Sequence, residues 1–285
     1  MFKNILKCLV ILLLFFSFSC SEVTAATTPE KEIRTLLINH NKALEKNDIE
    51  TIKNCYTSDY KSADGFDLPS LVDMIKKTNA TYGNMKYKTK ISDIMIFDNY
   101  AVAQVTDITN AMIFHDKDKK DTAKAGHLTG KSAYAVFLKK TSNGWKIFYD
   151  DILMEETSLK YGIANKLDIN LTAPVFIKEG EEYDLSLKVN KPNDIIALAS
   201  ISNEEIVYPA REPDEQFRKL SIDNDLERIV RANKKNLDEY AVATVGFTRV
   251  SLNKDETKAR IEILGMAYIL KRINMQNQKV AHDKI

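Results

Sequence analysis

The sequence has few glycines, prolines and cysteines, and no excess of charge of either sign. Its 285 residues include 9 Gly and 6 Pro, which excludes collagen-like segments and argues against low-complexity linkers and glycine-rich phosphate loops. Lys and Arg together number 41, against 40 for Asp and Glu, so no overall field attracts nucleic acid or an anionic membrane surface. We therefore expect no nucleic-acid partner.

The three cysteines offer no internal disulfide. Cys8 and Cys20 lie in an N-terminal segment that we expect to be processed, which leaves Cys55 alone. Cys55 falls in a helical pattern, where a buried, inert thiol is favoured over a nucleophile. The four histidines lack the close spacings of zinc ligands. The sequence therefore predicts no metal site and no cofactor.

Residues 1 to 26 are typical of an export signal. Lys3 and Lys7 come before an apolar run, residues 8 to 16, that is too short to span a bilayer. Two processing outcomes stay open: cleavage after small residues near Ala25, or acylation of Cys20 in a stretch that resembles a bacterial lipobox. A lipid anchor would then be the only link to a membrane. We expect an exported protein that is periplasmic, anchored as a lipoprotein, or secreted.

Residues 27 to 162 combine helical patterns with a later run of alternating strands. Capping residues predict helices that start near Thr28, Asp48 and Asp67, the second of them running through Tyr56. After Gly83 the hydrophobic period changes from 3.6 to 2. Four long antiparallel strands then follow, expected at 87–97, 100–114, 126–140 and 145–156. Helices followed by such a meander predict an α+β fold.

This order of elements, closed by the run Gly144-Trp145-Lys146-Ile147, resembles the NTF2-like superfamily, in particular its SnoaL-like and DUF4440-type branches. The resemblance covers about residues 27 to 160. It implies a curved sheet that forms a cone with its helices, open at one end, and a homodimer formed through the sheet. Members use the cone as an isomerase or hydrolase pocket, a binding site or a dimer surface, so the fold alone does not decide the function.

Residues 163 to 275 indicate a second, all-β domain. Five strands are expected within 167–176, 183–189, 195–208, 240–250 and 260–273, with one helix at 223–233. This pattern favours a β-sandwich that is immunoglobulin-like in architecture. Its loop from Tyr208 to Pro213 is either a rigid, proline-bounded connection, which is favoured, or a contact for a protein partner of this domain. Residues 276 to 285 are polar and are predicted to form a flexible tail.

Two apparent functional motifs, a phosphate-binding loop and a carboxylate pair, are not supported once the residues are placed on strands. Ala125–Ser132 fits a relaxed phosphate-loop pattern, but a charged segment precedes it and a strand follows it, so we interpret Gly130 as a bend in a curved strand. Asp150 and Asp151 do not form a carboxylate pair, because successive side chains of a strand point to opposite faces.

The remaining candidate is Asp151, which alternation places inside the cone on the same face as Trp145 and Ile147. A carboxylate in an apolar cone can act as a general base with a raised pKa. The alternative is a solvated Asp151 at the cone mouth. The expected pocket-lining residues are Tyr56, Tyr60, Tyr134, Trp145 and Tyr149.

Three functions stay open for such a chain. The first is a non-enzymatic binding or interaction protein of the cell envelope, which the attached β domain and the lack of a catalytic constellation favour. The second is a small-molecule isomerase or hydrolase that uses Asp151 as its general base. The third is a carrier of a small apolar ligand held in the cone.

Overall fold

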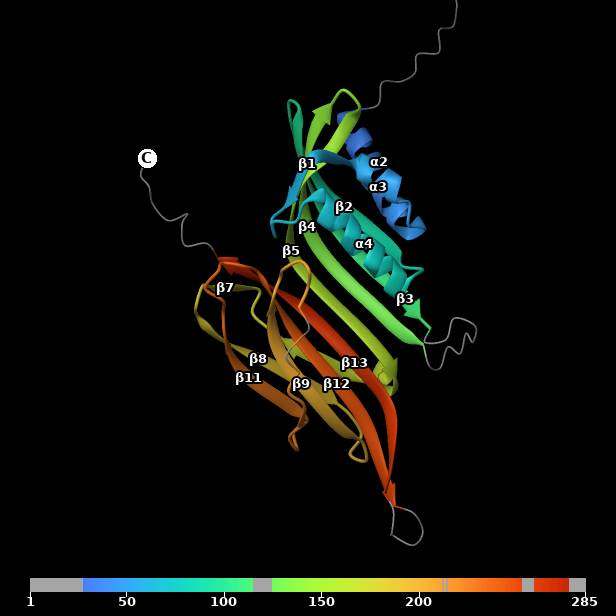
Figure 1. Ribbon diagram of the computed structural model, residues 1–285, viewed down its shortest axis with the longest axis vertical. Coiled ribbons are helices and arrows are strands. Elements are labelled where there is room, and N and C mark those ends of the chain that lie inside the picture. Colours follow the sequence, from blue (N-terminus) through green and yellow to red (C-terminus); the bar gives the residue numbers. More distant parts are fainter. Residues whose placement is uncertain (1–27, 115–124, 212, 214, 253–258, 277–285) are drawn as a thin grey trace, which may run out of the picture.

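The structure is a computed structural model that describes residues 28–114, 125–211, 213, 215–252 and 259–276 (Figure 1). The expected export signal with Cys20, and all but the first residue of the expected tail, lie outside the described residues. Within the described residues, no helix combines the length and the apolar character that crossing a membrane requires.

Three helices begin where the capping residues predict them. They are α2 (Pro29–Lys46), α3 (Ile49–Cys55) and α4 (Leu68–Tyr82). The side chains of Asp48 and Asp67 accept hydrogen bonds from the backbone N–H groups of Thr51 and Ser70, at 3.1 and 2.9 Å, which satisfies free donors of each first turn. The expected course of the second helix through Tyr56 is wrong, because this residue starts the strand β1 (Tyr56–Ser62), which pairs in parallel with β5.

The four predicted strands form the antiparallel meander, and the α+β arrangement is confirmed. They are β2 (Lys86–Phe97), β3 (Tyr100–Ile113), β4 (Gly126–Thr141) and β5 (Gly144–Gly162). The helices cover one face of this sheet (Figure 1). Apolar residues of both layers are buried between them, among them Ile33, Leu37, Ile52, Leu138 and Ile147.

The C-terminal half is built from short and long strands. After the 3-10 turn η2 (Ile163–Lys166) come β6 (Asp168–Thr172), β7 (Phe176–Lys178), β8 (Glu182–Asn190), β9 (Ile196–Glu205), β10 (Arg218–Lys219), β11 (Asp225–Arg231), β12 (Glu239–Leu252) and β13 (Ala259–Gln276).

The helix predicted at 223–233 is wrong, because this segment is the strand β11. It pairs along its whole length with β8. Val230 is buried, whereas Ile229 is 71% exposed. The positions of Leu226 and Val230, four residues apart, suit one face of a strand as well as one face of a helix, so pairing with β8 decides the outcome.

The two halves share one sheet. Strand β13 pairs antiparallel with β5, from Lys271 opposite Glu156 to Gly265 opposite Gly162. The strand order is therefore β10-β9-β12-β13-β5-β4-β3-β2. The expected domain boundary at residue 162 falls at the end of β5, beside this pairing.

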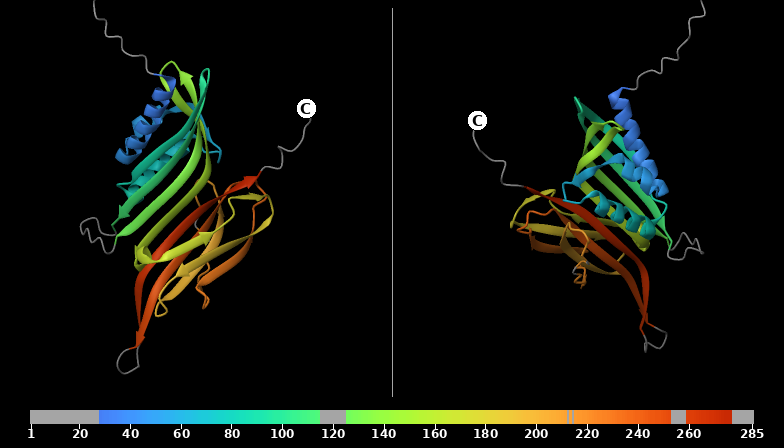
Figure 2. Two further views of the ribbon diagram at one scale, coloured as in Figure 1. Left: turned by 180° about the vertical axis from the view of Figure 1, so that it is seen from behind. Right: turned by 45° about the horizontal axis from the view of Figure 1, so that its top comes forward.

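A separate sheet of three strands, ordered β11-β8-β6, covers the face opposite the helices. Tyr268 of β13 lies opposite Leu159, which packs in a cluster with Tyr82 of α4. The neighbouring Ala267 and Ile269 point the other way, into the buried cluster of the C-terminal half. Figure 2 shows the molecule from behind and with its top turned forward. The immunoglobulin-like sandwich itself stays a prediction.

Tyr208 joins the two halves a second time. Its hydroxyl lies within hydrogen-bond distance of Asp73 and, at 2.9 Å, of the Lys77 ammonium, both on α4. Its ring packs edge-on against Phe66. The start of the loop from Tyr208 to Pro213 is thus held against the N-terminal half.

Candidate functional site

A bulge at Phe148 changes which residues of β5 face the helices. Ile147 lies opposite Leu138, but Tyr149 lies opposite Phe137, so Phe148 has no partner of its own. Beyond the bulge, Asp150 is opposite the buried Val136. The prediction that Asp151 faces the interior of the cone is therefore wrong, because the extra residue shifts the alternation by one position.

Asp150 is the carboxylate on the helix-covered face. Its Oδ2 accepts a hydrogen bond of 2.8 Å from the hydroxyl of Tyr60, a residue only 2% exposed. Burial raises the pKa of Asp150 to about 6, and the bond from Tyr60 opposes that shift. Tyr60 in turn packs edge-on against Tyr56, with ring centroids 4.7 Å apart.

Further polar side chains pair inside the same layer. The Tyr56 hydroxyl lies 2.9 Å from Nε2 of His40, whose Nδ1 lies 3.1 Å from the amide oxygen of Asn41. Asn41 donates to both carboxylate oxygens of Asp107, at 3.1 and 3.2 Å, and Tyr134 donates to the same carboxylate at 2.6 Å. These bonds satisfy polar groups that would otherwise be costly to bury.

The interior of the predicted cone is thus occupied by side chains. Of the five predicted pocket-lining residues, four take part in the buried cluster between helices and sheet: Tyr56, Tyr60, Tyr134 and Trp145. The fifth, Tyr149, lies on the other side of the sheet. The pairing of Tyr149 and Asp151 with Phe137 and Ala135 places both on the face that the helices leave uncovered.

Tyr149 and Asp151 meet in a cavity of about 320 Å³ where the two halves join. Here β5 changes its neighbour, from β1, which ends its pairing at Ser62 opposite Asp150, to β13, which starts at Lys271 opposite Glu156. The cavity lies in the fork where β1 and β13 diverge on the same side of β5. Its lining comes from six separate segments of the sequence, and includes Asp64, Tyr149, Asp151, Phe176, Asp238 and Asn274. Junctions of this kind are common places for binding sites.

Arg272 holds the wall of this junction cavity together. Its side chain is fully buried and makes ion pairs with Asp64, after β1, and Asp238, before β12. Its Nε donates to the Asn274 side chain at 2.8 Å, and Asn274 donates to the backbone oxygen of Leu153 at 2.9 Å. Burial acts to lower the pKa of Arg272, but the two aspartates outweigh it and raise that pKa.

Asp151 is the carboxylate of the cavity that remains available to bind a ligand. Among the residues that the structure describes, it makes no hydrogen bond or ion pair. Burial raises the pKa of Asp151, Arg272 lowers it, and the charges of Asp238 and Asp64 raise it. Three carboxylates therefore share one guanidinium, which leaves the site with an excess of negative charge.

The sequence suggested only part of this site. Asp151 and Tyr149 were candidates, whereas Arg272, Asp238 and Asn274 were not. One signal was present: Lys271 and Arg272 are adjacent in a strand, so one of them must point inward. Across the described ranges, histidine, cysteine and acidic side chains form no group of three or more that could hold a metal ion.

Comparison with known proteins adds a likeness of fold. No protein-family model and no curated protein sequence matches the chain. Solved structures do match. Bd1075 of Bdellovibrio bacteriovorus is 13% identical, with a TM-score of 0.35, over 43% of this chain and 39% of that chain. Part of this chain resembles NTF2-like proteins.

An NTF2-like family protein of Streptomyces avermitilis is 11% identical, with a TM-score of 0.37, over 44% of this chain and 97% of its own. The CaMKII hub of S. rosetta is 14% identical, with a TM-score of 0.32, over 45% of this chain and 98% of its own. At this identity the likeness concerns the fold alone, over less than half of the chain.

Proposed function

We propose that this chain is a non-enzymatic binding protein whose ligand site is the junction cavity. The observation that carries the proposal is Asp151, a half-buried carboxylate without a hydrogen-bond or ion-pair partner in the described part of the chain, in a cavity with two further aspartates. An unpaired carboxylate in such a setting is stabilised by a bound cation.

The ligand class follows from the lining. Asp151 supplies an acceptor for an ammonium group, and Asp64 and Asp238 add negative charge behind it. The rings of Tyr149 and Phe176 lie in the same lining and offer apolar contact, as well as a face for a cation. A volume of about 320 Å³ suits a small organic molecule. The proposed ligand is therefore a small aliphatic or aromatic amine in its protonated form.

Calorimetric titration with butylammonium tests this proposal, with butanol and butyrate as neutral and anionic probes of similar size. We expect saturable binding of butylammonium only. Asp151→Asn should weaken it at least tenfold, since it removes the charge and keeps the shape. Asp168→Asn is the matched control, because Asp168 lines a different cavity and should leave the affinity unchanged.

Two outcomes would overturn the proposed site. One is equal binding of butylammonium and butanol, which would remove the role of charge. The other is equal butylammonium affinity in the wild type and Asp151→Asn. Because Asp151 lies at the cavity surface and has no bonded partner among the described residues, the variant should fold normally, which circular dichroism and thermal unfolding would verify.

The two alternatives from the sequence find less support. An isomerase or hydrolase in the cone pairs Asp151 with a tyrosine such as Tyr56 or Tyr134, yet these tyrosines lie on the opposite face of the sheet. A carrier of an apolar ligand needs an open cone, and buried side chains occupy that space.

We also propose that the chain is exported and carries out its binding role in the cell envelope, anchored through Cys20 or released by cleavage near Ala25. The support is the sequence pattern of residues 1 to 26. Mass spectrometry of the N-terminus from native cells distinguishes the two forms. An acylated Cys20 establishes the anchor, a chain starting near residue 26 establishes cleavage, and an uncleaved Met1 contradicts both.

A homodimer through the uncovered face of β2 and β3 is the proposed assembly. Phe97 and Tyr100 lie opposite each other there and are 60% and 56% exposed, and Met95 on the same face is 43% exposed. Exposed apolar side chains grouped on one sheet face are typical of protein contacts. Sedimentation equilibrium should give a dimer for the wild type and a monomer for Tyr100→Ser combined with Phe97→Ser.

A further inference from the structure

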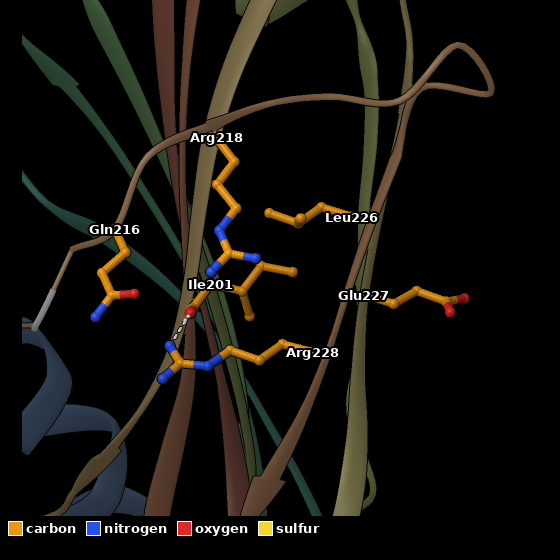
Figure 3. A pocket seen from close by; sticks show the side chains of 6 residues that line it. All are labelled: Ile201, Gln216, Arg218, Leu226, Glu227 and Arg228. Carbon is orange, nitrogen blue, oxygen red and sulfur yellow. Dashed lines mark hydrogen bonds between the residues drawn. The ribbon is translucent and has the colours of Figure 1, made fainter.

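A second, smaller cavity of about 60 Å³ lies at the open side of the C-terminal half, away from the junction cavity. It is bordered by the strands β9, β10 and β11. Figure 3 shows its lining: Ile201, Gln216, Arg218, Leu226, Glu227 and Arg228. Two of these six residues are arginines, and the side chain of Ile201 lies between their guanidinium groups in Figure 3.

Strand geometry explains how Arg228 reaches this place. The inward face of β11 carries Leu226, Arg228 and Val230, and Val230 is in the buried cluster of this half. Arg228 lies nearer the rim, where its stem covers apolar surface and its head stays polar. Its Nη1 donates to the backbone oxygen of Ile201 at 2.6 Å, which fixes the guanidinium against β9.

Arg218 enters from the other sheet. It opens β10, where it pairs with Ala199 of β9, and its side chain extends toward Arg228 (Figure 3). Glu227 borders the cavity but points away from both arginines (Figure 3). In the described part of the chain, neither Arg218 nor Arg228 forms an ion pair with a carboxylate.

Two positive charges that line one small cavity repel each other, and an anion bound between them offsets this repulsion. Each guanidinium has five N–H donors in a planar fork, and Arg228 uses one N–H group on Ile201. The free donors match the oxygens of a carboxylate or a phosphate, which arginine binds in pairs of parallel hydrogen bonds. A volume of about 60 Å³ has room for such a group but not for a large ligand.

We propose that Arg218 and Arg228 form an oxyanion-binding site that takes one carboxylate or phosphate group. It is independent of the junction cavity, because it lies in another part of the fold and selects the opposite charge. The group is either a free ion or the charged end of a larger molecule, since Arg218, which lines the cavity, is exposed to solvent.

The test is calorimetric titration of the full chain with inorganic phosphate and with acetate, in a background of constant chloride. We expect saturable binding of at least one of them at millimolar concentrations, and a loss of at least fivefold in affinity for Arg218→Gln. Arg218 is exposed, and its side chain makes no hydrogen bond or ion pair within the described residues, so this variant should remain folded. Comparing acetyl-glycine with acetate, and phenyl phosphate with phosphate, separates free ions from charged ends of larger molecules.

Arg249→Gln is the matched control, because Arg249 is a surface arginine already paired with Asp194. It should bind both anions as the wild type does. The site is disproved if neither anion binds saturably, or if Arg218→Gln and Arg249→Gln change the affinity equally. Asp151→Asn should leave anion binding unaltered, so failure here and failure of the proposed amine site are told apart.

Discussion

Arg272 and Asp64 lie 208 positions apart in the sequence and join the two halves of the chain through two hydrogen bonds of 2.6 and 3.1 Å. Both side chains are almost completely buried. Asp238 is the second partner of the same guanidinium. Because Asp64 follows β1 and Arg272 belongs to β13, this cluster fixes the fork at which β5 changes neighbours, and with it the wall of the junction cavity.

Removing this guanidinium should destabilise the protein strongly. Arg272→Gln leaves two largely buried aspartate side chains without their counterion, and such losses cost about 3 to 5 kcal/mol of unfolding free energy. Urea unfolding at pH 7 measures the change. Arg249→Gln, at a surface ion pair, should cost at most about 1 kcal/mol. Equal effects of the two variants would contradict the structural role of the buried cluster.

A methyl group at Gly265 should disrupt the pairing of β5 with β13. A Cβ atom there would lie 2.4 Å from the backbone oxygen of Tyr161 and 2.8 Å from the backbone nitrogen of Ile163, and backbone atoms cannot move aside cheaply. We expect Gly265→Ala to lower the unfolding free energy by about 2 kcal/mol or more. The measurement is thermal or urea unfolding.

Gly246→Ala is the control for this prediction. Gly246 is in the neighbouring strand β12, and the nearest atom to its added Cβ, the backbone oxygen of Leu198, is 4.0 Å away. Alanine suits a strand better than glycine does, so the variant should be neutral or more stable by up to about 1 kcal/mol. A loss like that of Gly265→Ala would mean that the tight approach of β5 and β13 is not the cause.

Local signals predicted most of the N-terminal half. The caps at Asp48 and Asp67 and the alternation of the four long strands depend on residues near in sequence. The strand β1 escaped prediction because its partner, β5, is distant along the chain, and nothing local distinguishes Tyr56 at its start from a helical residue. Strand β11 was mistaken for a helix for the same reason. In both segments, pairing with a strand that is distant in the sequence decides the structure against the local helical pattern.

Two residues of the candidate site, Tyr149 and Asp151, were predicted from the sequence, but their position in the fold was not. Asp151 was selected by strict alternation, which fails where Phe148 bulges. A bulge adds one residue and leaves no clear mark in a strand of apolar and aromatic residues. Arg272 and Asp238 escaped prediction because their role exists only where the two halves meet, in a shared sheet that the sequence pattern does not indicate.

His40 should make stability depend on pH below neutrality. Burial lowers the pKa of His40, so its neutral form is favoured in the folded state. That contribution is complete above the unfolded pKa, about 6.5, and is lost as the pH falls through the lower folded value. His40→Gln should therefore lose less stability than the wild type between pH 7 and pH 5. The measurement is the urea midpoint of both proteins at a series of pH values, and profiles that run parallel for the wild type and His40→Gln would refute this prediction.

Asp150 should affect the pH dependence of stability in the opposite direction to His40. The pKa of Asp150 is raised from 3.8 to about 6, so the folded state holds its proton more tightly than the unfolded chain does. The resulting stability is complete below about pH 4 and is lost as the pH rises through 6. A shift of about two units corresponds to about 2 to 3 kcal/mol. At pH 7 the buried, ionised carboxylate therefore lowers the free energy of unfolding, and the hydrogen bond from Tyr60 offsets part of this loss.

Asp150→Asn removes this cost, because the amide is neutral at every pH and its oxygen can still accept from Tyr60. Relative to the wild type, the variant should gain about 2 kcal/mol of unfolding free energy between pH 4 and pH 7. Urea unfolding at a series of pH values measures the difference. Asp151→Asn is the control on the open face, where solvent screens the charge and the gain should be smaller. A larger gain for Asp151→Asn would mean that Asp151 is the carboxylate enclosed by the helices, and Asp150 the one facing the junction cavity.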